Sequence, residues 1–177
     1  MKVFIIGYMG SGKSSIGQLL AKKLNYKFTD LDNDIEIFTG CTVSEIFNNE
    51  GEEKFREYEK EALERIRLKD EVVIATGGGT PCYFNNMNIM NTNGITVYLK
   101  ANAEILYKRV FSGLKKRPLL DSLEYEDIRA EIKKTLLKRE GFYLKAKIVI
   151  DTDNLSEQQV ISYLMQNREF VRSLHLS

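Results

Sequence analysis

The chain has 177 residues, of which 43% are hydrophobic and 29% are charged, and its formal net charge at pH 7 is +1. This balance gives no reason to expect a nucleic acid or an anionic membrane surface as a partner, and no apolar run is long enough to span a membrane. Cys41 and Cys82 lack the spacing of a metal or redox pair, so we expect unpaired thiols and a cytoplasmic location. The only histidine, His175, lies near the end of the chain, which argues against a histidine base. We expect one globular domain over residues 1–177.

The first fifteen residues combine a short apolar strand, a glycine-rich loop and the start of a helix. Residues 7–14 read G-Y-M-G-S-G-K-S, which matches the phosphate-binding pattern G-x-x-x-x-G-K-[ST]. In such a phosphate loop, Lys13 would reach the β- and γ-phosphates and Ser14 would ligate Mg²⁺. A plain glycine-rich turn is disfavoured because the strand and the helix stand in the required order. The nucleotide-binding residues predicted here are Gly10, Ser11, Gly12, Lys13, Ser14 and Ser15.

The next part of the chain alternates between helix and strand patterns. Residues 26–29 are expected to form a strand that ends in an acidic cluster at residues 30–34. Thr42 and Glu45 have the spacing of a capping box, and a long charged helix is expected from about residue 51 to residue 68. A helix between successive strands is typical of parallel βαβ units.

The second half continues this alternation. Further strands are expected over residues 72–75, 95–99 and 147–150, and further helices are expected to start near Pro81, Asn102, Tyr125 and Ser156. The polar stretch over about residues 112–124 is long for a structureless connection, so we interpret it as a mobile lid. The predicted fold is a three-layer α/β fold with a five-stranded parallel sheet and helices on both faces. Ligands of such sheets bind beyond the carboxyl ends of the strands.

The acidic cluster after the second strand holds candidate catalytic residues. Asp30 and Asp32 are two residues apart, so one carboxylate can face a metal ion while the other faces an acceptor. Asp30, Asp32 and Asp34 could equally favour the N-terminus of the next helix through its dipole. We adopt the dipole explanation for Asp34 and the functional one for Asp30 and Asp32, because these two lie beside the phosphate loop.

A glycine triplet and four arginines complete the candidate site. The triplet Gly77-Gly78-Gly79 follows a buried strand and would let a small molecule approach the backbone closely. Arg56 lies in an acidic helix, where the pattern alone favours a salt bridge, on a solvated face, to a residue three or four positions away. Arg109 and Arg117 flank the lid, and an arginine on a closing loop commonly stabilises a transferred phosphoryl group. Arg139 lies beyond the lid and could equally be a surface residue.

Taken together, these motifs resemble those of shikimate kinases. The matching segments are the phosphate loop, Phe28-x-Asp30-x-Asp32, Gly51-Glu52-x-x-Phe55-Arg56-x-x-Glu59, Gly77-Gly78-Gly79, Arg117-Pro118-Leu119-Leu120, Arg139 and Asp151-Thr152. They occur in the order of the family and extend over about residues 2–152. The phosphate loop is shared by a large superfamily, whereas the combination of all segments is much more specific.

The resemblance implies the P-loop kinase fold and phosphorylation of the shikimate 3-hydroxyl by ATP with Mg²⁺, a step toward chorismate and the aromatic amino acids. We expect a monomer whose partners are ATP and shikimate, with no nucleic acid and no membrane. The roles implied are catalysis by Lys13, Asp32 and Arg117; acceptor binding by Asp32, Arg56, Gly77, Gly78, Gly79 and Arg139; and metal binding by Ser14 and, through water, Asp30. Asp32 would accept the hydroxyl proton, Arg117 would reach the phosphates from the lid, and Arg109 would lie near the adenine.

Two positions depart from the family pattern, and other functions remain to be weighed. Gly141 stands where a proline is usual and would loosen the segment that carries Arg139, and Leu144 replaces a usual arginine. The alternatives are a P-loop kinase for another sugar acid such as gluconate, a nucleotide-dependent switch and a catalytically silent binding module. A GTPase switch would normally carry N-K-x-D, which is missing here, and a silent module would be expected to lose Asp32 or Arg117.

Overall fold

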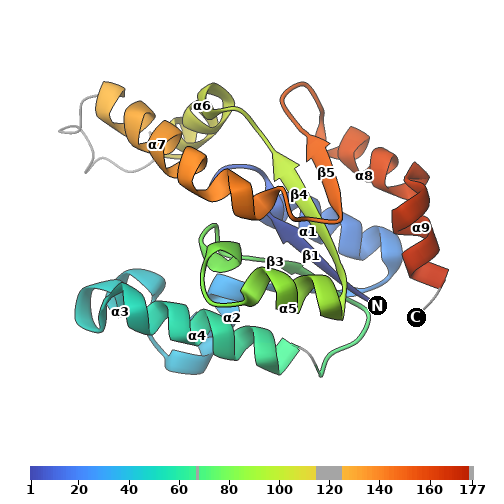
Figure 1. The fold of residues 1–177 in the computed structure, drawn as a ribbon, viewed down its shortest axis with the longest axis horizontal. Coiled ribbons are helices and arrows are strands. Elements are labelled where there is room, and N and C mark those ends of the chain that lie inside the picture. The colour runs from blue at the N-terminus through green and yellow to red at the C-terminus, as the bar shows by residue number, and fades with distance from the viewer. Residues whose placement is uncertain (67, 115–124, 176–177) are drawn as a thin grey trace.

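The computed structural model describes residues 1–66, 68–114 and 125–175, in which a parallel sheet lies between two layers of helices (Figure 1). The five strands are β1 (Lys2–Ile6), β2 (Lys27–Asp30), β3 (Val72–Ala75), β4 (Ile95–Lys100) and β5 (Ile148–Asp151). Their order across the sheet is β2-β3-β1-β4-β5, and every neighbouring pair is parallel. The predicted five-stranded parallel sheet is therefore confirmed, with β1 at its centre.

The central strand is apolar from Val3 to Ile6 because helices cover both faces of the sheet. Val3 and Ile5 belong to one buried core, and Phe4 and Ile6 belong to the other. The first core is shared with α1 (Lys13–Leu24), α8 (Glu157–Gln166) and α9 (Arg168–His175). The second is shared with α2 (Leu31–Thr39), α3 (Val43–Asn49), α4 (Gly51–Ile66), α5 (Asn86–Asn93), α6 (Ala103–Leu114) and α7 (Tyr125–Tyr143).

Several helix boundaries follow directly from the local sequence. Thr42 and Glu45 form the predicted capping box at the start of α3, and Ser156 and Gln159 form another at the start of α8. Gly40 ends α2 in the left-handed conformation, with a φ of 73°. The side chains of the two capping boxes satisfy backbone groups that the helix ends would otherwise leave unpaired.

Two segments differ from the expected elements. Pro81 lies within a short 3₁₀ turn, η1 (Thr80–Cys82), and not at the start of a longer helix. Helix α5 begins only at Asn86, two residues after Phe84, whose φ of 48° is rare for a bulky residue. The expected last helix divides into α8 and α9 at Asn167. The Asn167 side chain accepts a hydrogen bond from the backbone N–H of Phe170 at 3.0 Å and so caps the start of α9.

The stretch over about residues 112–124 lies only partly within the described residues, and its role as a lid stays a prediction. Helix α6 continues through Leu114, so residues 112–114 are helical. Residues 115–124, with Arg117 among them, lie outside the described residues, and α7 begins at Tyr125 as expected. Within the described part of the chain, no helix is both long and apolar enough to cross a membrane.

Candidate active site

Three segments meet at the carboxyl end of the sheet because the strands that precede them are parallel and in register. Ala75 of β3 pairs with Ile5 of β1 on one side and with Asp30 of β2 on the other. The phosphate loop, the acidic cluster and the glycine triplet therefore leave the sheet side by side. Together with residues of α4 and α7, they line a cavity of about 650 Å³. The structure thus brings these three segments together around one cavity.

The phosphate loop folds so that its lysine lies back across it. Gly10 and Gly12 have φ values of 81° and 92°, a region that favours glycine, and α1 begins at Lys13. The Lys13 ammonium group donates a hydrogen bond to the Tyr8 carbonyl at 3.0 Å. Burial lowers the pKa of Lys13 to about 8, against the opposing effect of the neighbouring aspartates. A cation beside the N-terminus of a helix favours the binding of a polyphosphate, because both attract its negative charge.

Ser14 and Asp30 bring oxygen atoms together beside the phosphate loop. The Ser14 hydroxyl donates to Asp30 Oδ2 at 2.6 Å, and Asp30 Oδ1 accepts a hydrogen bond from the backbone N–H of Asp32 at 3.2 Å. Mg²⁺ prefers such oxygen ligands and commonly takes only one or two from the protein when phosphates supply others. Among the described residues, no group of three or more His, Cys, Asp or Glu side chains could hold a metal. The donor set fits Mg²⁺ bound together with a nucleotide.

Asp32 presents a carboxylate to the cavity. Its Oδ1 atom is buried and has no hydrogen-bond partner in the described part of the chain. Burial, followed by the nearby Asp30 and Glu59 carboxylates, raises the pKa of Asp32 to about 6. A carboxylate of this pKa is largely ionised at pH 7, so it can accept a proton from a hydroxyl group bound beside it.

Arg56 lies inside the cavity, so its interpretation as a solvated surface charge is wrong. The residue is 6% exposed, and its guanidinium donates from Nη1 to Glu59 Oε2 at 2.7 Å and from Nη2 to Glu52 Oε1 at 2.8 Å. The ion pairs at helical spacing are therefore present, but on a buried face. Glu59 is fully buried, and burial raises the pKa of its carboxyl group while the Arg56 charge opposes that shift.

The glycine triplet makes room for side chains of the protein itself. A Cβ atom at Gly79 would lie 2.6 Å from Arg56 Nη1, and one at Gly77 would lie 2.6 Å from Glu59 Oε1. None of the three glycines has a positive φ, so they supply space here and not an unusual conformation. The Tyr143 hydroxyl donates to the Gly78 carbonyl at 2.5 Å and fixes the middle of the triplet.

The other two described arginines of the predicted site lie in different cavities. Arg139 of α7 lines the same cavity as Arg56, and its Nη1 is 3.5 Å from the position of a Cβ on Gly78. Arg109 of α6 lines a second cavity of about 520 Å³ beside the phosphate loop. Its Nη2 donates to the Thr152 carbonyl at 3.3 Å. Arg56 and Arg139 thus share the first cavity, whereas Arg109 lies in the second cavity beside the phosphate loop.

Two serines of the phosphate loop have contrasting surroundings. The Ser15 hydroxyl donates to Glu157 at the start of α8, which ties α1 to that helix. The Ser11 hydroxyl is buried, and no described residue is its hydrogen-bond partner. The assignment of both serines to nucleotide binding stays a prediction.

Three residues around Arg56 had no predicted role. Glu59 follows Arg56 by three residues in one helix, a spacing that could have revealed the contact. The Thr80 hydroxyl donates to Glu59 Oε1, and the Tyr83 hydroxyl donates to Glu52 Oε1 at 2.7 Å. Thr80 and Tyr83 lie 21 and 31 residues after their partners, and no local pattern relates their loop to α4.

The fold and this site together define a class of protein. A phosphate loop with a buried lysine is the binding motif for nucleotide phosphates, and the adjoining cavity carries a carboxylate and two arginines, whose charges suit an anionic acceptor. The protein is thus a P-loop kinase of the small-molecule type. The family model of shikimate kinase matches residues 9–169, and the chain belongs to that family.

Relatives match nearly the whole chain. Shikimate kinase of Azobacteroides pseudotrichonymphae is 44% identical over 165 residues, which cover 93% of this chain and 97% of the relative. The crystal structure of shikimate kinase from Bacteroides thetaiotaomicron has a TM-score of 0.86 at 36% identity and covers 94% of this chain and 97% of that one. Shikimate kinase from Acinetobacter baumannii, solved in complex with shikimate, has a TM-score of 0.83 at 32% identity, with coverages of 93% and 90%.

Proposed function

We propose that this chain transfers the terminal phosphoryl group of ATP to the 3-hydroxyl of shikimate, in the cytoplasm, as a step toward chorismate and the aromatic amino acids. The observation that carries the proposal is the Asp32 carboxylate, which lines the cavity between the phosphate loop and Arg56 and whose buried Oδ1 has no hydrogen-bond partner among the described residues. A hydroxyl group bound there would lie between a proton acceptor and the terminal phosphate of a nucleotide. This is the geometry that in-line transfer requires.

The acceptor carboxylate would bind to Arg56 and Arg139. A guanidinium has five N–H groups, and three of those on Arg56 point to Glu52 and Glu59. One N–H on each terminal nitrogen remains for a further acceptor. Two parallel donors match the two oxygens of a carboxylate and fix its orientation as well as its position. Backbone groups of the glycine triplet complete this side of the cavity.

The nucleotide would bind along the phosphate loop. Ser14 and, through water, Asp30 would hold Mg²⁺, which when bound neutralises charge on the phosphates. Lys13 and the backbone N–H groups of the loop would bind the β- and γ-phosphates. Arg117 would approach from the lid, and Arg109 would lie beside the adenine. The chain's own residues thus act by positioning and charge stabilisation, and none forms a covalent intermediate.

The test is ADP release with ATP and Mg²⁺ in the presence of shikimate, of gluconate or of no acceptor. We expect release with shikimate only, and we expect the Asp32→Asn variant to lose it. The Asp34→Asn variant is the matched control, because Asp34 instead pairs with Arg65 at 2.9 Å. Faster release with gluconate would identify a kinase for another sugar acid. Nucleotide binding without release for any acceptor would identify a silent module.

A further inference from the structure

The loop after the glycine triplet bonds both acidic partners of Arg56. The Thr80 hydroxyl donates to Glu59 Oε1, and the Tyr83 hydroxyl donates to Glu52 Oε1 at 2.7 Å. Glu59 and Glu52 in turn accept hydrogen bonds from Arg56 at 2.7 and 2.8 Å. The five side chains form one network between α4 and a single loop. A displacement of this loop would therefore be transmitted to Arg56.

The Tyr83 ring also covers the guanidinium directly. Arg56 Cζ lies 4.2 Å from the Tyr83 ring centroid, closer than it lies to the rings of Phe55 at 5.2 Å and Phe47 at 5.9 Å. A planar guanidinium over an aromatic face is attracted by the ring quadrupole and stacks on it. Tyr83 thus acts on Arg56 twice, through its ring and through Glu52.

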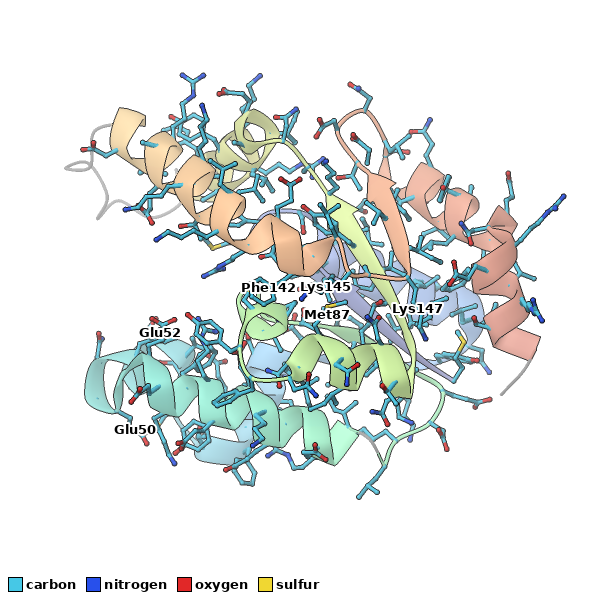
Figure 2. The ribbon with its side chains drawn as sticks, viewed as in Figure 1. Glu50, Glu52, Met87, Phe142, Lys145 and Lys147 are labelled. Atoms are coloured by element: carbon cyan, nitrogen blue, oxygen red, sulfur yellow. The ribbon has the colours of Figure 1, made fainter. Side chains whose placement is uncertain are left out.

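The two acidic partners of Arg56 differ in how firmly they are held. The Glu59 side chain is fully buried, whereas the Glu52 side chain is 52% exposed. Glu52 lies above the α4 ribbon in Figure 2, while Glu50 lies below it. A half-exposed glutamate has many rotamers available, so the hydrogen bond from Tyr83 restricts Glu52 to the one that meets Arg56.

The backbone that carries Tyr83 is fixed on its other side. Asn86 is fully buried and donates from Nδ2 to the Thr80 carbonyl at 3.0 Å, and its backbone N–H donates to the Tyr83 carbonyl at 3.2 Å. Phe84 lies between Tyr83 and Asn86 in the chain and has a φ of 48°, a conformation that persists only where its surroundings impose it. The ring of Tyr83 is therefore presented to Arg56 by a constrained loop.

We infer that Tyr83 is a positioning residue for the acceptor carboxylate. It holds the plane of the Arg56 guanidinium so that the two remaining N–H groups face the cavity. This inference rests on the proposed role of Arg56 as a carboxylate ligand. Without Tyr83, Arg56 keeps its ion pair with Glu59, but neither the ring face nor the fixed Glu52 carboxylate defines the guanidinium plane.

The first experiment compares Tyr83→Leu and Tyr83→Phe with the wild-type enzyme in steady-state kinetics. We expect Tyr83→Leu to raise the KM for shikimate about fivefold to tenfold, since it loses both the stacked ring and one hydrogen bond. The KM for ATP and kcat should stay within about twofold. Tyr83→Phe keeps the ring and should show a rise of only about twofold. The control is Tyr163→Leu on α8, where the tyrosine is 47% exposed, and it should change neither KM.

The second experiment repeats Tyr83→Leu in an Arg56→Lys background. An ammonium group has no plane to be oriented, so the substitution should then change the KM for shikimate by less than about twofold. An unchanged KM in Tyr83→Leu alone, an equal rise in the Arg56→Lys background or an equal rise in the KM for ATP would each overturn the inference. A Tyr83→Phe variant as impaired as Tyr83→Leu would also overturn the inference. If Tyr83→Leu does not fold, the KM for shikimate of Tyr83→Phe decides the role of the hydroxyl. A wild-type enzyme with no shikimate-dependent ADP release would instead refute the proposed function, and the inference with it.

Discussion

A side chain at Gly79 would collide with the guanidinium of Arg56. A Cβ atom built there lies 2.6 Å from Arg56 Nη1 and 2.8 Å from Cζ. Arg56 is held by carboxylates on two sides, so it cannot withdraw without breaking an ion pair. A Cβ at Gly78, in contrast, meets no described atom closer than 3.5 Å. Adjacent glycines of one triplet therefore tolerate substitution differently.

The first prediction uses this contrast. Gly79→Ala should lower the free energy of unfolding by roughly 1–3 kcal/mol, the range for a methyl group forced into filled space. It should also raise the KM for shikimate, because Arg56 must move. Gly78→Ala should cost less than about 0.5 kcal/mol. Urea unfolding of both variants checks the prediction, and equal losses of stability would contradict the steric argument.

The second prediction concerns Arg56→Lys. The substitution keeps the charge but loses the two parallel donors, so the KM for shikimate should rise at least about tenfold, equivalent to about 1.4 kcal/mol. The KM for ATP should change little. Initial rates at varied shikimate and varied ATP check both statements. A variant that handles shikimate like the wild type would show that Arg56 does not bind the acceptor carboxylate.

The third prediction concerns Lys13→Ala. The charge acts on bound phosphate and not on packing, so turnover should fall by the equivalent of roughly 3 kcal/mol or more while the fold persists. Burial lowers the pKa of Lys13 to about 8, so the charge does not stabilise the folded protein when no nucleotide is bound. Turnover and thermal unfolding are measured together, with Lys22→Ala on the exposed side of α1 as the control. A variant that keeps a third of the wild-type rate would refute the assigned role.

The fourth prediction follows from the raised pKa of Asp32, about 6 in the folded chain against an ordinary value of 3.8. Between these pH values the folded state binds more protons than the unfolded state. The contribution of Asp32 to the free energy of unfolding therefore decreases as the pH rises through this range. In EDTA and without nucleotide, Asp32→Asn should therefore raise the free energy of unfolding at pH 7.5 by about 1–2 kcal/mol. The gain should shrink toward pH 4.5.

The control for this fourth prediction is Asp34→Asn, which removes a carboxylate paired with Arg65 and should give no gain. Turnover of the wild-type enzyme should fall as pH drops below about 6, where Asp32 takes up a proton. An Asp32→Asn variant that is less stable than the wild type at pH 7.5 would contradict the argument.

The sheet and the phosphate loop were predictable from sequence because both depend on local patterns. The run Val72–Ala75 is apolar throughout, as a strand buried on both faces must be, and the structure places β3 there. The Lys13–Ser14 pair ends a motif whose geometry is set within eight residues. The split at Asn167 was missed because an asparagine can continue a helix as well as cap one.

The burial of Arg56 was harder to predict because charged residues surround it in sequence. The buried residues of α4 are Phe55, Arg56, Glu59, Ala62, Leu63 and Ile66, which follow helical periodicity. Arg56 and Glu59 thus continue the apolar stripe, and this spacing would have placed them on the inner face. The contacts of Thr80 and Tyr83 could not be predicted in this way, since they depend on how a distant loop packs against α4.

The last prediction concerns Gly141, the departure that we expected to loosen the segment carrying Arg139. Helix α7 continues through Gly141 to Tyr143, and a Cβ atom at Gly141 would have no described atom within 4 Å. Its φ is not positive, so alanine fits the same backbone. Gly141→Ala should raise the free energy of unfolding by about 0.5–1 kcal/mol through higher helix propensity and a less flexible unfolded chain.

The same substitution at Gly17 in α1 is the matched control. There a Cβ atom would lie 2.6 Å from Cε2 of Phe28, so the steric cost should outweigh the gain in propensity, and Gly17→Ala should destabilise the protein. Urea unfolding separates the two variants. The KM for shikimate should stay within about twofold of wild type in Gly141→Ala, because the backbone that carries Arg139 is already helical. A loss of stability in Gly141→Ala, or a clear rise in that KM, would show that the enzyme needs the flexibility of this glycine.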